Sequence, residues 1–297
     1  MLATQPAKPR RSLRSRIRKA RPLAFTLLCV IAVAMLLPIV ATFLYSFFPK
    51  SEIAAYMKQR GSYDAARWMD VLLSPVQVSL RQYYAILIEE PLYLKLFVNS
   101  AFYAAAILVG QLLVLPLTAY ALSRFRFFGR DALFFVVLAL MLLPFQVTMA
   151  PSVMTLRALN LMNTQWAVIL PMVFSPFYLF LLRQFMLGIP GEIIEAGQMD
   201  GAGSLRCFLH VMMPVCRPIL CAAAALSFAD SWNMVEQPLV YLTDSSMQPL
   251  SVMFNQISTD AAEVAFAGAA LYLAPMLLIY LYFQDDILLG VQLSELK

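Results

Sequence analysis

Long runs of apolar residues alternate with short polar segments along most of the chain. A run of about 20 apolar residues has the length that an α-helix needs to cross the hydrocarbon core of a bilayer. Six runs reach this length, and we expect each to form a membrane-spanning helix. They cover Leu23–Phe48, Leu96–Ser123, Ala132–Leu156, Ala158–Leu182, Pro218–Leu242 and Val264–Gln284.

One boundary between these runs is very short, and one run contains charged residues. Only Arg157 separates the third run from the fourth, so we expect a tight polar turn around Asn160–Thr164. The fifth run contains two acidic residues, Asp230 and Glu236. Ionisable residues inside a membrane span are costly, and each therefore calls for a functional or structural explanation.

The composition agrees with a polytopic membrane protein. Of the 297 residues, 61% are hydrophobic and 13% are charged, whereas soluble domains have about 45–50% apolar and about 25% charged residues. This excludes a soluble enzyme and a disordered protein. The sequence predicts an all-α fold with six transmembrane helices.

The positions of the basic residues predict the orientation in the membrane. Residues 1–22 hold eight basic residues and no acidic residue, and the loop between the second and third runs holds Arg124, Arg126 and Arg130. Because cytoplasmic segments are enriched in Lys and Arg, both should be cytoplasmic. Residues 23–48 then form an uncleaved anchor helix, residues 49–93 an extracytoplasmic loop, and residues 291–297 a cytoplasmic tail. The net charge of +5 follows this topology and does not indicate nucleic-acid binding.

The cysteine and histidine residues predict no metal site. Cys29, Cys207, Cys216 and Cys221 show no CxxC spacing, and His210 is the only histidine. We interpret the cysteines as small apolar core residues.

The long cytoplasmic segment between the fourth and fifth runs, residues 184–217, is patterned as two short helices around glycines. Pro190 suits the first position of a helix, and Glu192 and Glu195 would lie near the positive end of its dipole. Gly201 and Gly203 should end this helix, and Ser204 should cap a second one. The apolar face of the second helix would hold Leu205, Phe208, Leu209 and Met212. The alternative is an amphipathic pair that lies on the bilayer surface.

This segment resembles the EAA loop of the permease subunits of bacterial ABC importers. The matching residues, at the spacing of the EAA motif, are Glu195, Ala196, Gly197, Gly201, Val211, Met213 and Pro214, and Asp200-Gly201-Ala202 strengthens the match. Gly197 stands where the motif has a second alanine, and glycine lowers helix stability by about 1 kcal/mol. In that family the loop inserts into a cleft of the ATP-hydrolysing subunit. The resemblance therefore implies that Glu195, Ala196, Asp200, Gly201, Ala202 and Pro214 couple the chain to an ATPase.

The resemblance extends over roughly residues 80–290, with residues 94–290 as the importer transmembrane domain. The chain is similar to the carbohydrate-uptake branch of these permeases, and within that branch to the maltose-type second permease subunit. The stretches that carry it include Asn99-Ser100, Ala119–Arg124, Leu143–Val147, Phe180–Phe185 and Ser231–Asn233. It implies a second permease, an ATPase dimer and an extracytoplasmic solute-binding protein as partners. The chain has no GxxxxGK[ST] phosphate loop, so we expect no enzymatic activity and no cofactor, with ATP bound by the separate subunit.

A polar group in the fifth run suggests a translocation path. Asp230 lies roughly 18 Å along a helix from Pro218, past the bilayer midplane. Asp230, Trp232, Asn233 and Glu236 combine an aromatic ring with carboxylate and amide groups, which is how proteins hold sugars. The alternative is hydrogen bonding between permease subunits. Two further classes stay open, a polyamine or peptide as the solute and a stand-alone channel.

Overall fold

The computed structural model describes residues 11–61, 75–256 and 262–295. Within these ranges the chain forms helices and no β-strand, in agreement with the predicted all-α class. Parts of the predicted basic tail 1–22, of the outer loop 49–93 and of the C-terminal tail 291–297 lie outside the described residues.

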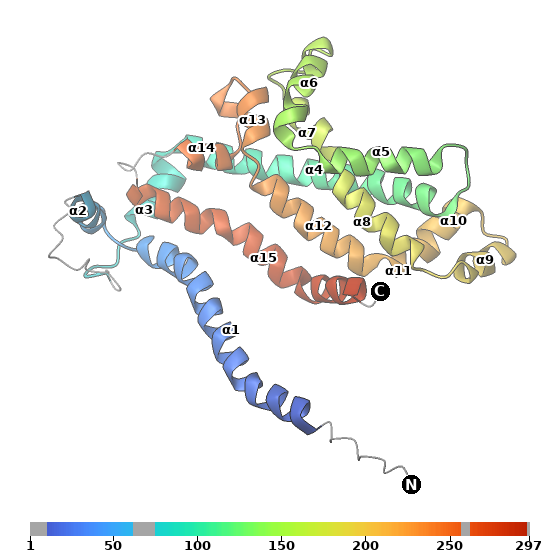
Figure 1. Ribbon diagram of the computed structural model, residues 1–297. Coiled ribbons are helices and arrows are strands. Elements are labelled where there is room, and N and C mark those ends of the chain that lie inside the picture. The colour runs from blue at the N-terminus through green and yellow to red at the C-terminus, as the bar shows by residue number, and fades with distance from the viewer. Residues whose placement is uncertain (1–10, 62–74, 257–261, 296–297) are drawn as a thin grey trace, which may run out of the picture.

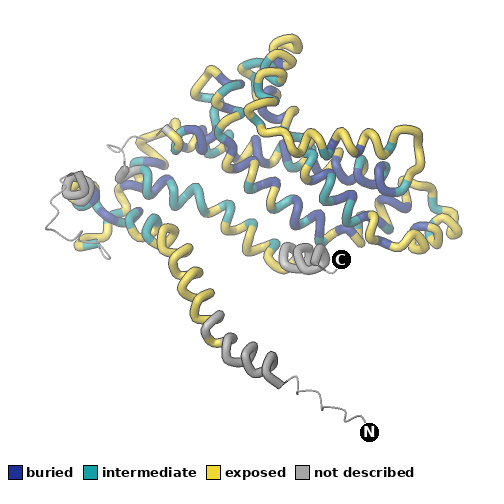
Figure 2. Tube along the Cα trace, viewed as in Figure 1, coloured by how far each residue is buried: buried dark blue, intermediate teal, exposed yellow. Residues whose placement is uncertain are grey.

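Helix α1, Arg11–Tyr45, extends away from the other helices (Figure 1). No residue in its most apolar stretch is buried, and it is exposed along most of its described length (Figure 2). Its end contacts helix α15, Ala262–Glu295, where the rings of Tyr45 and Phe266 lie 5.3 Å apart. An apolar helix without a protein neighbour is stable when lipid surrounds it, so α1 has the properties of a membrane anchor.

Four helices form the centre of the molecule. They are α4 (Pro91–Arg124), α8 (Pro176–Leu187), α12 (Arg217–Trp232) and α15. Helix α4 packs against α8 and α12, and α12 packs along α15. Small residues of α12, among them Ala222 and Ala223, are buried, and small side chains allow helix backbones to approach closely in a membrane.

Four helices in the described ranges are long and apolar enough to cross a membrane, and two bent helix pairs raise the number to six if each pair is one span. The six predicted spans equal this upper count. The two pairs are Arg130–Leu142 with Phe145–Ala158, and Ser204–Val215 with Arg217–Trp232, which is bent by 76°.

The third predicted span, Ala132–Leu156, is two helices and not one. Helix α5, Arg130–Leu142, and helix α6, Phe145–Ala158, meet at 109°. Pro144 lies between them with extended backbone, ψ 146°. Proline lacks the N–H that a continuing helix needs and clashes with the preceding turn. The prediction of a continuous helix was therefore wrong at Pro144.

The fourth predicted span, Ala158–Leu182, begins later and is interrupted. Helix α7 covers Gln165–Val173, and Ser175 precedes α8 in extended conformation. The predicted polar turn is confirmed, because Asn160 and Asn163 adopt the left-handed region with φ 54° and 56°. Asn163 Oδ1 then accepts hydrogen bonds from the backbone N–H groups of Thr243 and Asp244.

The fifth predicted span, Pro218–Leu242, also ends early. Helix α12 stops at Trp232, and helix α13 covers Glu236–Tyr241. Pro238 lies in the first turn of α13, where its missing N–H costs little. Together α6, α7 and α13 form a lobe that projects from the bundle (Figure 1), with Leu156, Ala167 and Tyr241 in its core.

The remaining short elements lie at the ends of the bundle. Helices α2 and α3 and helix α14 gather at one end, and helices α9 to α11 lie at the other, beside the loop between α4 and α5 (Figure 1). Their bounds are α2 Lys50–Gly61, α3 Arg81–Tyr84, η1 Ala85–Glu89, η3 Ser245–Met247 and α14 Leu250–Gln256.

The backbone N–H of Ser246 donates to Asp244 and holds the pKa of that carboxyl below its usual range.

Candidate functional site

The coupling segment, which we define as Glu192–Val215, forms a helix, a glycine turn and a second helical stretch. Helix α9 covers Glu192–Met199, and Glu192 and Glu195 lie in its first turn, as predicted. Helix α10 covers Ser204–Cys207 and continues through a π-helical turn, η2 Phe208–Met212, into α11, Met213–Val215. The arrangement agrees with the predicted helix, glycine break and helix.

Gly201 closes α9 through its backbone conformation. Its φ of +83° lies in the left-handed region, which glycine adopts without the steric cost that a Cβ adds. Ala202 N–H donates to the Gly197 carbonyl, and Gly201 N–H donates to the Gln198 carbonyl, both at 3.0 Å. This pair of bonds is the Schellman motif, which satisfies the last carbonyls of a helix. An added Cβ at Gly201 would meet no atom within 4 Å, so the requirement for glycine here comes from the backbone.

Two predicted helix starts were wrong by one or two residues. Pro190 is not the first residue of α9, because Gly191 is the N-cap and the helix begins at Glu192. Ser204 does not cap α10, because it is the first helical residue, Gly203 precedes it, and no side chain caps this end. Such shifts are common at helix termini and leave the order of the elements unchanged.

Gly197 brings the two halves of the coupling segment close together. An added Cβ at this position would lie 3.3 Å from Cys207 Sγ and 3.7 Å from a methyl group of Val211. Cys207 is fully buried, and its thiol donates to the Ala202 carbonyl at 3.6 Å. The small residue therefore allows close packing, which offsets the expected loss of helix stability.

The coupling segment exposes large apolar side chains. Of the four residues predicted to form the apolar face of the second helix, Phe208 and Met212 are buried, whereas Leu205 is 64% exposed and Leu209 is 51% exposed. Met199, in α9, is 88% exposed. The predicted apolar face is thus divided between buried and exposed positions, and Cys207, not Leu205, faces the core. Exposed apolar groups on a projecting segment indicate a contact surface.

Helix α12 exposes a polar stripe, which we define as Asp230 and Asn233. The two residues are three positions apart and therefore lie on the same side of the helix; both are exposed. Tyr178 of α8, itself buried, donates its hydroxyl hydrogen to Asp230 Oδ2 at 2.6 Å. A carboxylate accepts up to about four hydrogen bonds, so the bond from Tyr178 orients Asp230 and leaves acceptor capacity on its exposed side.

The other polar residues of this region have separate partners. Asn233 donates to the Ala229 carbonyl at 2.9 Å, and its Oδ1 lies 3.2 Å from the Tyr272 hydroxyl, which donates to the Trp232 carbonyl at 2.6 Å. Glu236, exposed at the start of α13, accepts from Gln146 of α6 at 3.3 Å. Glu236 therefore lies at the lobe, one helix break away from the polar stripe.

Trp232 does not expose a ring face. It is 1% exposed and stacks against Phe228 at 5.4 Å and Tyr272 at 5.2 Å, with Phe97 at its edge. Its Nε1–H donates to the Tyr272 carbonyl at 3.1 Å. The structure thus corrects the prediction that Trp232 stacks on a solute, because aromatic side chains of this chain already occupy its surroundings.

Gln111 is a polar residue of α4 whose hydrogen-bond partners lie in this chain. It is buried, accepts from the Ser227 hydroxyl, and donates to the Met172 carbonyl at 2.7 Å. Because α7 ends at Val173, this amide satisfies a carbonyl at the end of a broken helix. Gln111 thereby connects α4, α7 and α12.

The sequence interpretation missed the residues that support the site. Tyr178 and Tyr272 were not singled out, since a tyrosine in an apolar run carries no signal of its partner. No group of three or more potential metal ligands occurs in the part of the chain that the structure describes.

Comparisons with known proteins agree with this architecture. The chain matches the family of binding-protein-dependent transport system inner membrane components over residues 113–287. It is 29% identical over 287 residues to the arabinooligosaccharides transport system permease protein AraQ of Halalkalibacterium halodurans, covering 94% of this chain and 99% of the relative. It is 32% identical over 212 residues to the sn-glycerol-3-phosphate transport system permease protein UgpE of Yersinia enterocolitica, covering 70% and 75%.

A solved structure has the same fold. A chain in the crystal structure of a bacterial ABC transporter involved in the import of the acidic polysaccharide alginate matches with a TM-score of 0.76 and 24% identity, over 94% of this chain and 99% of that chain.

The helices and the exposed coupling segment define a multi-pass membrane transport protein of the all-α class. The chain belongs to the family of binding-protein-dependent transport system inner membrane components, the permease subunits of ABC importers. The family resemblance expected from the sequence is thereby confirmed.

Proposed function

We propose that the coupling segment docks a separate ATP-hydrolysing subunit dimer and that the chain forms half of the pathway of an ABC importer. The other half would come from a second, homologous permease, and an extracytoplasmic binding protein would deliver the solute. The observation that carries the docking role is the Schellman turn at Gly201, which presents Met199 and Leu205 in exposed positions at the end of the bundle. ATP would be bound by the docked subunit.

The alternative for this segment is attachment to the bilayer surface. The exposed apolar residues lie among the exposed carboxylates Glu195 and Asp200. An anionic leaflet attracts Lys and Arg and disfavours carboxylates. This mixture fits a protein cleft better than a lipid surface.

Glu195→Lys tests docking, with Glu192→Lys as its matched control. Both glutamates are exposed and lie in the first turn of α9, so both variants lose the same favourable interaction with the helix dipole. We expect only Glu195→Lys to lose the ATPase during purification of the complex from membranes. Equal retention of the ATPase in both variants would contradict the docking role. Binding of a peptide with the sequence of the segment to lipid vesicles, weakened equally by both substitutions, would favour the bilayer surface.

For the solute we propose a neutral oligosaccharide that passes along the polar stripe and Glu236. Carboxylate and amide oxygens accept hydrogen bonds from sugar hydroxyls without a cation. Two exposed carboxylates disfavour an anionic solute. We therefore expect this chain to transport neither glycerol-3-phosphate nor alginate. The name of the AraQ relative, an arabinooligosaccharides transport system permease protein, supports a sugar as the solute.

An uptake assay with four labelled probes tests the solute. Cells that carry the complex, and cells that lack only this chain, are given arabinotriose, glycerol-3-phosphate, spermidine or a tripeptide. We expect uptake of arabinotriose that depends on this chain. Uptake of spermidine alone would show that the carboxylates bind a cation, and ATP-independent flux of all four probes would indicate a stand-alone channel.

We further propose that both termini and the 184–217 segment are cytoplasmic and that residues 49–93 are outside. The basic residues of the tail and of the loop between α4 and α5 support this orientation. A cysteine placed at Ser204 should resist an impermeant maleimide added outside, whereas one placed at the exposed Val76 should react. The reverse pattern would contradict the orientation.

A further inference from the structure

The ends of α4, α5 and α8 meet directly before the coupling segment, and two arginines connect them. Helix α8 ends at Leu187, four residues before α9 begins. The last carbonyl groups of a helix have no partner within the helix. Here, arginine side chains donate hydrogen bonds to carbonyls at the ends of α4 and α8.

Arg124, the last residue of α4, binds the chain on its way into the coupling segment. Its Nη2 donates to the Met186 carbonyl at 2.6 Å and to the Ile189 carbonyl at 2.7 Å. The two acceptors lie on either side of the end of α8, so one guanidinium fixes the direction in which the chain leaves this helix. Hydrogen bonds from a charged donor are shorter and stronger than those between neutral groups.

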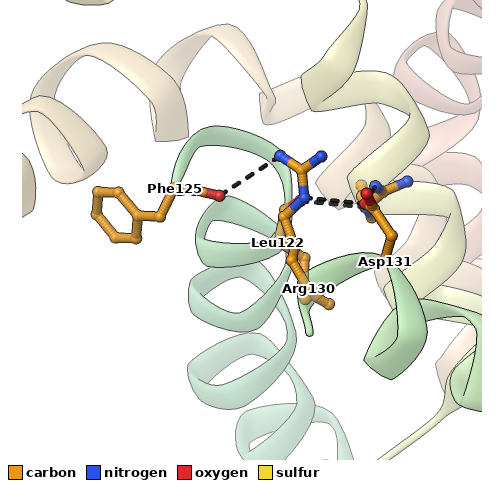
Figure 3. A network of polar contacts seen from close by, with 5 residues as sticks. Leu122, Phe125, Arg130 and Asp131 are labelled. Atoms are coloured by element: carbon orange, nitrogen blue, oxygen red, sulfur yellow. Dashed lines mark hydrogen bonds and ion pairs between the residues drawn. The ribbon is translucent and has the colours of Figure 1, made fainter. Parts of the chain in front are cut away.

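Arg183 makes the reciprocal connection from α8. Its Nε donates to the Leu122 carbonyl in the last turn of α4 at 3.3 Å, and its guanidinium lies 3.7 Å from the centre of the Phe134 ring of α5. One Nη atom is 4.0 Å from Asp131, which also pairs with Arg130 at 3.0 Å. Figure 3 shows Arg130 between Asp131 and the Phe125 carbonyl.

The burial of Arg183 is informative because burying a guanidinium is costly unless its donors are used. Arg183 is 8% exposed. A position that needed only apolar packing would hold leucine or methionine at no such cost. Its planar group meets an aromatic face and a helix carbonyl together, which a lysine ammonium cannot do with the same geometry.

Helix α4 also contacts the returning half of the coupling segment. The rings of Tyr120 and Phe208 lie 5.2 Å apart, and both residues belong to the largest core cluster, together with Ile194 of α9. The end of α4 therefore contacts the coupling segment where the chain enters it and again where the chain returns.

We propose that Arg124 and Arg183 form an arginine clamp that makes the ends of α4, α5 and α8 move as one body with the coupling segment. Both are positioning residues, and the proposal rests on the proposed docking of an ATPase at that segment. In the clamped state, a displacement of α9 reaches α4 through the hydrogen bonds of both arginines and α5 through the contacts of Arg183 with Phe134 and Asp131. Without the clamp the same displacement is absorbed at Gly188 and Ile189.

Arg124→Gln tests the clamp, with Arg126→Gln as its matched control. Arg126 is an exposed arginine of the same loop, so both variants remove one positive charge from the same part of the membrane surface. Hydrogen exchange of the intact complex is measured without nucleotide and in the ATP–vanadate state, on peptides that cover residues 120–131 and 186–200. Arabinotriose uptake per ATP hydrolysed is measured on the same preparations.

In the wild type and in Arg126→Gln, nucleotide trapping should change exchange in both peptides. In Arg124→Gln the change in hydrogen exchange should be confined to residues 186–200. Uptake per ATP hydrolysed should fall about tenfold, which lies within the usual range of coupling between sites. The ATPase should stay bound. Arg183→Lys, which keeps the charge, should give the same pattern more weakly and serves if Arg124→Gln does not assemble.

Two results would overturn the clamp. One is identical behaviour of Arg124→Gln and Arg126→Gln. The other is loss of ATPase binding or of thermal stability in Arg124→Gln and Arg183→Lys with an unchanged ratio of uptake to hydrolysis, which is what a scaffold role predicts. If Glu195→Lys keeps its ATPase and its uptake, the docking proposal fails and the clamp fails with it. If Glu195→Lys loses both and Arg124→Gln behaves as Arg126→Gln, the clamp alone fails.

Discussion

The coupling segment and the polar stripe of α12 expose different kinds of side chain and hold them in place by different means. The coupling segment presents apolar groups such as Met199 and Leu205 from a turn whose shape depends on the φ of Gly201. The polar stripe presents Asp230 from the last turn of the regular helix α12 and Asn233 from the C-cap that follows it, with Tyr178 and Tyr272 behind them.

This difference determines what a substitution can do in each region. At the coupling segment, a change of one backbone conformation should displace the whole docking surface. At the polar stripe the backbone is regular, so single substitutions should act on one hydrogen bond at a time. The aromatic residues behind the stripe are the exception, since they form the core that supports it.

The largest effect should come from Trp232→Ala. The substitution opens a cavity beside Phe228 and leaves the Tyr272 carbonyl without its donor. Replacing a buried tryptophan by alanine costs about 3–5 kcal/mol. We expect a marked loss of thermal stability of the purified complex and of uptake of every solute, measured by a melting curve in detergent and by transport.

The control is Trp166→Ala in α7, where the side chain is 55% exposed; it should leave the melting temperature nearly unchanged. If Trp232→Ala kept wild-type stability and lost only sugar uptake, Trp232 would contact the solute after all. The contrast between a supporting core and an exposed stripe would then be wrong.

Gly201→Val should have the next largest effect. Its left-handed backbone conformation costs an L-residue about 1–2 kcal/mol, and no neighbouring atom would clash with the new Cβ. We expect loss of the Schellman turn and about a tenfold weaker affinity of the ATPase, close to the free-energy cost of the turn, as measured by titrating the ATPase onto the permease complex.

Gly201→Asn separates the turn from the surface, because asparagine adopts the left-handed region more readily than other non-glycine residues. If the turn alone matters, this variant should bind the ATPase nearly as well as the wild type. Weak binding of both variants would show instead that the cleft of the ATPase has no room for a side chain at this position.

The coupling segment could be predicted in detail because its signals are local. Glycine, proline and glutamate spacing determines where a helix begins and ends, and the Gly201 break was expected from the sequence. The faces of the second helix were harder to predict, because Gly197 draws Cys207 into the core in place of Leu205. A close approach of two helices depends on both partners, and one helix alone does not reveal it.

The α12 region was predicted less well because its structure depends on distant residues. Hydropathy located the fifth span but not its end at Trp232, and it gave no sign that Tyr272, forty residues later, would stack on that ring. Pro144 and Pro238 were visible in the sequence as possible breaks. Apolar length alone nevertheless predicted continuous spans, since hydropathy does not depend on helix geometry.

Asp230→Asn tests the stripe itself at moderate cost. The amide keeps the size of the side chain and one acceptor oxygen for Tyr178 but loses the charge. A hydrogen bond to a charged group contributes about 1.5–3 kcal/mol and a neutral one about 1 kcal/mol. We expect about a fivefold loss of arabinotriose uptake with an intact complex, whereas Glu89→Gln, which changes an exposed carboxylate at the end of η1, should have no effect.

The smallest effect should come from Tyr178→Phe, which leaves the charge of Asp230 in place and removes only the donor behind it. The lost bond joins α8 to α12 at 2.6 Å, and Asp230 can replace it with water on its exposed side. Such an exchange has a net cost of about 0.5–1.5 kcal/mol. We expect about a two- to threefold rise in the arabinotriose concentration for half-maximal uptake, with a melting temperature lowered by a few degrees at most and an unchanged maximal rate. Combining Tyr178→Phe with Asp230→Asn distinguishes orientation from an independent contact. If Tyr178 acts only by orienting the carboxylate, the double variant should transport like Asp230→Asn alone, whereas additive losses would place the tyrosine hydroxyl itself in contact with the solute.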